Sequence, residues 1–179
     1  MYMIQENVRK TLQKSFETIS FEDFSELFRH IRSTVKEYLN KTRPGIMLGL
    51  VKLGFDRGSF VGGLHYSGTN EIYLNKSALQ VMKEESDEEK YKAYLYFVLL
   101  HEYIHAVGYS HEGQTRSLTK IIIVDLFGPE HSLGKLAIYG LNYYFPYTFN
   151  MRRQETSRRD LLNPEYVTLH HIERDFAYQ

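Results

Sequence analysis

Apolar side chains recur every three or four residues at the start of the chain, which is the spacing of one helix face. The first such run covers residues 2–16. The second covers residues 20–39, where Ser20 and Asp23 resemble a capping box. We therefore expect an N-terminal helical segment over residues 1–42.

The pattern changes between residues 46 and 75 to short apolar runs separated by glycine and turn residues. Three of these runs are predicted to be strands: IMLGLVKLGF, SFVGGLHY and NEIYLN. A short helix is expected over residues 77–84. Residues 91–107 are then apolar on nearly every side, which is typical of a helix in the interior of a protein, and Ser86 with Glu89 resembles its capping box.

Helical spacing returns in the last third of the chain. We expect helices over residues 115–127 and 130–144, and a final helix that begins at Asn163-Pro164 and ends near Phe176. The predicted fold class is α+β, in a single domain. It comprises the N-terminal helical segment, the strands with the buried helix, and a helical C-terminal subdomain, over residues 1–42, 43–111 and 112–179.

The buried helix carries an H-E-x-x-H pattern formed by His101, Glu102 and His105. Four residues advance a helix by little more than one turn, so both imidazoles leave the same face and can bind one metal ion. Glu102 projects about 100° away and can act as a general base on a water molecule. Gly108 can adopt positive φ and turn the chain back, so that His111 returns to the ion. We therefore expect one Zn²⁺ ion bound by the three histidines.

The complete run HEYIHAVGYSH, residues 101–111, resembles the extended zinc motif of the metzincin metallopeptidases. The resemblance implies a zincin-like fold, in which a small twisted mixed sheet lies over the buried active-site helix and further helices lie N- and C-terminal to it. It implies that a zinc-bound water, activated by Glu102, hydrolyses peptide bonds. The substrate, a peptide or protein, would lie along the sheet edge, which we place at residues 62–67.

Three positions differ from that family. Metzincins place a methionine in a turn beneath the metal, and Met151 is the sole candidate downstream of the motif. Some members have a tyrosine two residues later, where this chain has Arg153. The archaemetzincins follow the third histidine with a cysteine, where this chain has Glu112. The subfamily therefore stays open.

Alternatives exist for the third ligand and for the function. If His111 is a surface residue, Asp125 or Glu130 on the following helix is the candidate ligand, whereas His65 is interpreted as an ordinary strand residue. The run HAVGYSHE also resembles part of the H-G-x-x-H-x-x-G-Y-D-H motif of bacterial metal-dependent endoribonucleases that mature ribosomal RNA, although Glu102 stands where that family has glycine. A non-catalytic zinc-binding module is the third possibility.

Composition narrows these choices. The chain has no cysteine, which excludes disulfides, Cys-ligated zinc and thiol catalysis. Lys plus Arg and Asp plus Glu both number 22, so no basic excess indicates nucleic acid as a partner. The sequence shows no signal peptide and no membrane-spanning run, so we expect a cytoplasmic protein. Such a peptidase needs control, and a terminal segment, with Phe176-Ala177-Tyr178 as a candidate, is expected to cover the cleft.

Overall fold

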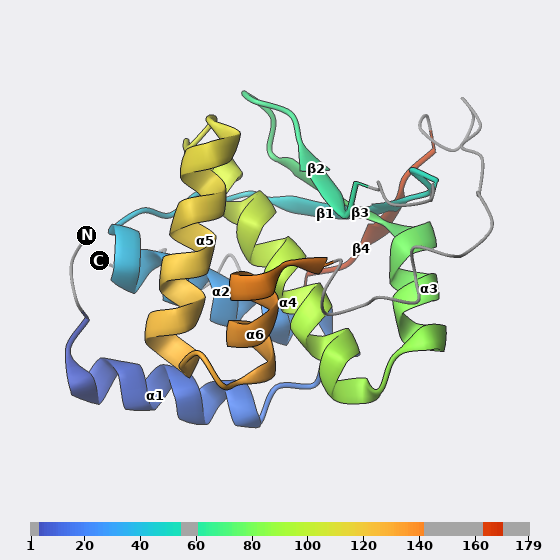
Figure 1. Cartoon of the computed structure of the whole chain (residues 1–179). Helices are drawn as coiled ribbons and strands as arrows, with labels where there is room; N and C mark the ends of the chain where they lie inside the picture. The colour runs from blue at the N-terminus through green and yellow to red at the C-terminus, as the bar shows by residue number, and fades with distance from the viewer. Residues whose placement is uncertain (1–3, 55–60, 142–162, 170–179) are drawn as a thin grey trace.

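The structure is a computed structural model, and it describes residues 4–54, 61–141 and 163–169. Within these residues the fold is α+β, with six helices and a small mixed sheet of four strands (Figure 1). The elements in chain order are α1 (Glu6–Glu17), α2 (Phe24–Leu39), β1 (Met47–Val51), β2 (Gly63–His65), β3 (Glu71–Asn75), α3 (Lys76–Glu85), α4 (Glu88–Ala106), α5 (Glu112–Phe127), α6 (Ser132–Tyr139) and β4 (Glu165–Val167).

The strands lie in the order β2-β3-β1-β4. β1 and β3 are parallel, with Leu48 opposite Ile72, and each pairs with its other neighbour in antiparallel orientation. β2 is therefore at an edge of the described sheet, where the sequence predicted an edge strand over residues 62–67. Leu48, Ile72 and Leu74 are fully buried, so one face of the sheet contributes to the core.

β4 corrects the predicted C-terminal helix. The segment after Asn163-Pro164 is extended, and Glu165–Val167 pairs with β1. Val167 is paired with Leu48, and the ammonium group of Lys76 contacts the carboxylate of Glu165. Pairing with a strand far away in the sequence thus outweighs the local helical pattern. The C-terminal part of the chain is consequently not helical throughout.

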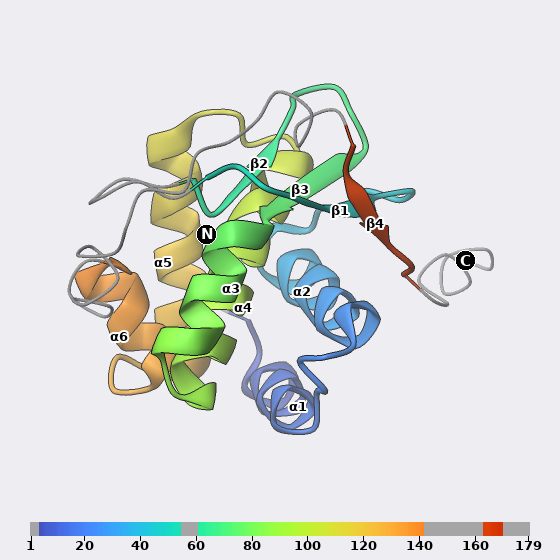
Figure 2. The ribbon, with the colours of Figure 1, turned by 90° about the vertical axis from the view of Figure 1, so that its right-hand side faces the viewer.

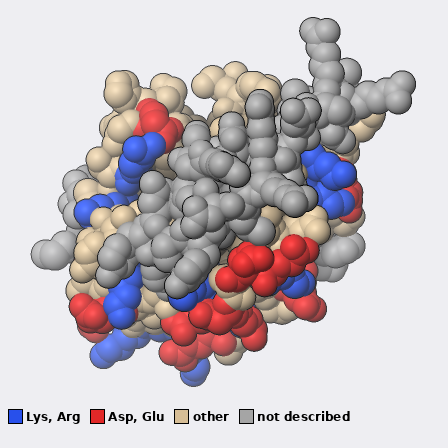
Figure 3. All heavy atoms as spheres, turned by 45° about the vertical axis from the view of Figure 1, so that its right-hand side comes forward, with Lys and Arg blue, Asp and Glu red and all other residues tan. Residues whose placement is uncertain are grey.

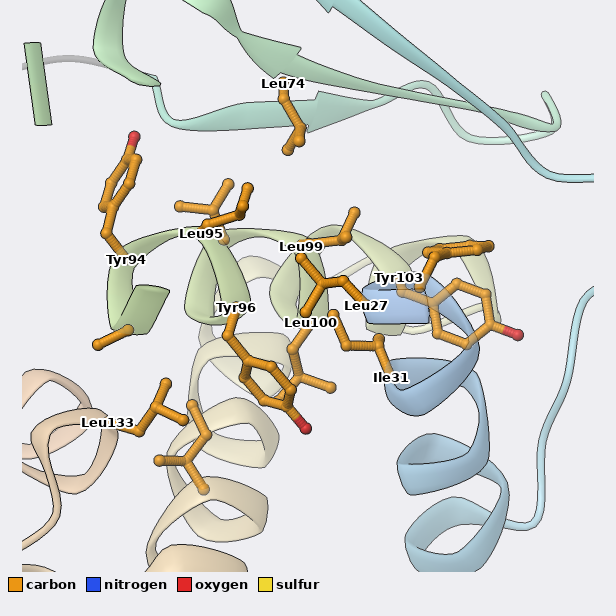
Figure 4. Packing of buried hydrophobic residues seen from close by; sticks show 14 of the residues in the cluster. Leu27, Ile31, Leu74, Tyr94, Leu95, Tyr96, Leu99, Leu100, Tyr103 and Leu133 are labelled. Atoms are coloured by element: carbon orange, nitrogen blue, oxygen red, sulfur yellow. The ribbon is translucent and has the colours of Figure 1, made fainter. Parts of the chain in front are cut away.

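Helix α4 is the central element of the fold and lies beneath the sheet (Figures 1 and 2). It contacts β2 and β3 on one side and α2, α5 and α6 on others. Figure 4 shows Leu95 and Leu99 directed towards Leu74 of the sheet, whereas Tyr96 and Leu100 lie on the opposite side of the helix. The prediction of a buried helix is confirmed. Within the described ranges, no helix is both long and apolar enough to cross a membrane.

The helix caps differ from the two predicted capping boxes. Asp87 is the N-cap of α4 and accepts a hydrogen bond from the Lys90 N–H at 2.8 Å, whereas Ser86 ends α3. Asp23 likewise caps α2 by accepting from the Ser25 N–H at 2.8 Å. An aspartate can cap a helix directly, because its carboxylate reaches the free N–H groups of the first turn. Both helices therefore begin slightly later than predicted.

Candidate metal centre

Three side chains that could hold a metal ion, called here the candidate metal group, meet where the end of α4 faces the start of α5. They are His101, His105 and Glu112, and one donor atom from each lies within 4.8 Å of the others. The distance from Glu112 Oε2 is 3.3 Å to His101 Nε2 and 3.1 Å to His105 Nε2. The two imidazole rings are close to perpendicular, with centroids 4.8 Å apart. The structure thus directs both helix histidines at one carboxylate oxygen.

His105 is held in place by the turn that follows α4. Its Nδ1 lies 2.7 Å from the carbonyl oxygen of Tyr109. Because a carbonyl only accepts, Nδ1 carries the proton and donates it. The same carbonyl accepts a hydrogen bond from the buried hydroxyl of Thr115, also at 2.7 Å. This arrangement is typical of metal-binding histidines, whose second nitrogen is fixed by an outer hydrogen bond.

We expect Thr115→Val to weaken zinc binding without loss of the fold. The substitution removes the hydroxyl that fixes the Tyr109 carbonyl, and therefore loosens the orientation of His105. Loss of such an outer partner typically costs about 10–100-fold in metal affinity. Competition with a chromogenic chelator measures the change, and Thr115→Ser is the control that keeps the hydroxyl. An unchanged zinc affinity in Thr115→Val would contradict this role.

The carboxylate of Glu112 is oriented by Arg116, one turn later on α5. Arg116 Nη2 donates to Glu112 Oε1 at 2.8 Å, which leaves Oε2 for the imidazoles. Partial burial by itself raises the pKa of Glu112, but His101, His105 and Arg116 outweigh it and bring the pKa below its ordinary value. Burial lowers the pKa of His101, which favours the neutral form that binds metals.

Glu102 lies beside this group without belonging to it. Its side chain is buried, with 6% exposed, and burial followed by the charge of Glu112 raises its pKa to about 8. Edge strand β2 lies directly over it: a Cβ on Gly63 would be 2.9 Å from Glu102 Cγ. A side chain at Gly63 would therefore displace Glu102, so the absence of one allows this close approach.

Gly108 takes the conformation that the sequence predicted. Its φ is +105°, in the region that favours glycine. The next N–H, of Tyr109, donates to the Ile104 carbonyl at 3.3 Å, and that of Gly108 donates to the His105 carbonyl at 2.9 Å. These are the bonds of a Schellman turn, which ends α4. The turn also places the Tyr109 carbonyl beside the His105 ring.

The other described residues that the sequence suggested as ligands lie outside the candidate metal group. His111 is the exposed N-cap residue of α5. The group found among the described residues contains His101, His105 and Glu112, but not His111. Asp125 accepts hydrogen bonds from Arg9 and Tyr38, so it is occupied elsewhere. Glu130 is exposed and forms an ion pair with Lys135. His65 lies on β2, where its Nδ1 donates to the Glu71 carbonyl.

Two predictions concern residues outside the described part of the chain. Met151, the candidate for the turn beneath the metal, belongs to residues 142–162. The terminal cover suggested by Phe176-Ala177-Tyr178 belongs to residues 170–179. Both stay predictions.

Sequence reasoning missed the contributions of Glu112, Gly63 and Thr115. Acidic residues are common in the first turn of helices, so Glu112 carried no signal that separated it from a capping residue. The glycine pair Gly62-Gly63 inside an apolar strand did carry one, because glycine in a strand often marks close backbone approach.

Comparison of the chain with family models, curated proteins and solved structures gives no match.

Proposed function

We propose that this chain is a zinc-dependent metallopeptidase with a zincin-like fold. The observation that carries the proposal is the arrangement at the end of α4: two imidazoles directed at one anionic oxygen, with the buried carboxylate of Glu102 alongside. A structural zinc site is normally closed by four protein ligands and needs no adjacent base. Three donors with a separate carboxylate are typical of a catalytic site.

The residues present fit zinc. Imidazole nitrogen and carboxylate oxygen are both common zinc ligands, and three protein ligands leave one position for water or substrate. The proposed ion is bound by His101, His105 and one donor from the junction at residues 111–112. Zinc in such a site polarises a carbonyl oxygen and lowers the pKa of water to about 7.

Glu102 performs the proton transfers in this proposal. The positive charge of a nearby zinc ion would lower the pKa of Glu102 from about 8. Its carboxylate could then take a proton from the attacking water as general base and return that proton, as general acid, to the nitrogen of the departing amine. Burial beneath β2 restricts the side chain of Glu102, which is one residue along α4 from His101. β2 is at an edge of the sheet formed by the described strands, and such an edge can align an extended peptide through main-chain hydrogen bonds.

The charge distribution supports a peptide over an RNA substrate. On the face shown in Figure 3, the described residues carry acidic and basic side chains together, rather than a continuous basic surface. This agrees with a formal net charge of +0 over the whole chain. Phosphate backbones are normally bound by an excess of Lys and Arg.

Incubation of the zinc-loaded protein with casein and, separately, with structured RNA tests the proposal. We expect fragments of casein, no cleavage of RNA, and no casein fragments after zinc is removed with a chelator. Cleavage of RNA alone would assign the site to a nuclease. Failure to cleave either substrate with one zinc bound per chain would favour the non-catalytic module.

We expect Gly63→Ala to lower hydrolysis beyond its effect on stability. The added Cβ would lie 2.9 Å from Glu102 Cγ and 3.0 Å from the Tyr73 carbonyl oxygen, so the Glu102 side chain must move. Over-packing of this kind costs about 1–3 kcal/mol of unfolding free energy. The displaced base should also reduce kcat per zinc-loaded molecule, by about 10-fold or more.

Gly62→Ala is the matched control for that variant. Its Cβ would meet Val98 Cγ2 at 2.9 Å and the Tyr94 hydroxyl at 3.1 Å, but Glu102 is not among its nearest contacts. Thermal denaturation and kcat are measured on both variants with zinc content matched. Equal losses of kcat in the two variants would show that the close approach of Gly63 to Glu102 has no particular role.

A further inference from the structure

We infer that Glu112, rather than His111, is the third protein ligand of the zinc ion, an inference that rests on the proposed function. The resulting site has two imidazoles and one carboxylate, where the metzincin motif has three imidazoles. The inference is drawn from donor spacing, hydrogen-bond accounting and the surroundings of the two competing side chains.

The distances from Glu112 to the two histidines match the ligand spacing of a tetrahedral site. Ligand atoms about 2.0–2.2 Å from a tetrahedral zinc ion lie about 3.3 Å from one another. Glu112 Oε2 lies 3.3 Å from His101 Nε2 and 3.1 Å from His105 Nε2. The donor atoms of all three residues lie within 4.8 Å of one another, so a small movement of the side chains brings them around one ion.

The hydrogen bonds of His105 support a cation between its Nε2 and the Glu112 carboxylate. His105 Nδ1 donates its proton to the Tyr109 carbonyl, so Nε2 of the neutral ring has only a lone pair. That lone pair faces Glu112 Oε2 at 3.1 Å, and a carboxylate also only accepts. A metal ion between the two atoms satisfies both acceptors at once, in the place that a second proton on the ring takes in the metal-free protein.

The second oxygen of the Glu112 carboxylate, Oε1, is held by a hydrogen bond from Arg116. Arg116 Nη2 donates to Oε1 of Glu112 at 2.8 Å, which directs Oε2 at the histidines. Metal-binding carboxylates are commonly held by such an outer hydrogen bond. Because α5 begins at Glu112, the helix also fixes the backbone from which this side chain projects.

His111 occupies a different environment. It is exposed, and its Nδ1 lies 3.7 Å from the position that a Cβ on Gly113 would occupy, against the first turn of its own helix. Its carbonyl accepts from the Thr115 N–H at 3.0 Å, so its backbone is fixed by α5. The imidazole that the motif assigns to the metal thus lies against its own helix, outside the group formed by His101, His105 and Glu112.

The test compares Glu112→Gln with His111→Gln in the full-length chain. Each variant removes one candidate donor while keeping a polar side chain of similar length. Zinc affinity is measured by chelator competition, and X-ray absorption of the zinc-loaded protein counts imidazole ligands. We expect Glu112→Gln to weaken zinc binding on the order of 100-fold or more, because one of three ligands is lost. His111→Gln should change the affinity less than about 3-fold, and the absorption spectrum should show two imidazoles.

The possible contrary results separate this inference from the proposed function. Loss of zinc in His111→Gln with retention in Glu112→Gln, or equal loss in both, would overturn the inference and leave a zinc peptidase. Three imidazoles in the spectrum of the wild-type protein would do the same. A wild-type chain that binds no zinc would overturn both. Circular dichroism of the metal-free variants controls for misfolding.

Discussion

Glu102→Gln is expected to abolish most hydrolysis while the protein keeps its zinc. Glutamine has nearly the same shape as glutamate and fits beneath β2, but it cannot take a proton from water. General acid–base catalysis contributes about 10²–10⁴-fold, so we expect kcat to fall by about that factor. Zinc affinity should be retained, because Glu102 lies outside the group of donors formed by His101, His105 and Glu112.

The measurement is kcat per zinc-loaded molecule, with zinc content determined on the same sample. Glu88→Gln is the matched control, since Glu88 is an exposed glutamate on the same helix that pairs with Lys92. It should hydrolyse substrate at the wild-type rate. If Glu102→Gln did so too, Glu102 would have no part in proton transfer, and the buried carboxylate would need another explanation.

His105→Ala is expected to remove the zinc ion itself. The substitution deletes one of two imidazoles on α4 and also breaks the hydrogen bond from His105 Nδ1 to the Tyr109 carbonyl. Structural zinc sites bind with apparent free energies of about 10–16 kcal/mol, shared among few ligands. Loss of one ligand should therefore leave less than stoichiometric zinc after dialysis, and hydrolysis should be undetectable.

Metal analysis of the dialysed protein measures this outcome. His65→Ala is the control, because His65 lies on β2 outside the candidate metal group and its Nδ1 donates to the Glu71 carbonyl. That variant should retain one zinc per chain. Full zinc occupancy and wild-type affinity in His105→Ala would place the ion elsewhere in the protein.

The parts of the fold that depend on local pattern could be predicted from sequence. The apolar run of α4 indicates a buried helix, and the spacing of His101 and His105 places them on one face by helix geometry alone. Gly108 was predictable for the same reason, since a helix often ends at a residue with positive φ. These features need only a few neighbouring residues to specify them.

The parts that depend on contacts between distant segments could not be predicted in this way. β4 exists because Glu165–Val167 pairs with β1, a segment far away in the sequence that the local pattern does not specify. The position of Glu112 depends on how α5 approaches α4, which the motif spacing does not specify. The motif therefore indicated His111, the residue adjacent to the one that the structure directs at the histidines.

The most direct test of the account is a crystal structure of the zinc-loaded protein with anomalous diffraction recorded at the zinc absorption edge. We expect one strong anomalous peak within bonding distance, about 2.0–2.2 Å, of His101 Nε2, His105 Nε2 and a carboxylate oxygen of Glu112. A peak bound to other side chains, or imidazoles of α4 with no anomalous peak between them, would contradict it.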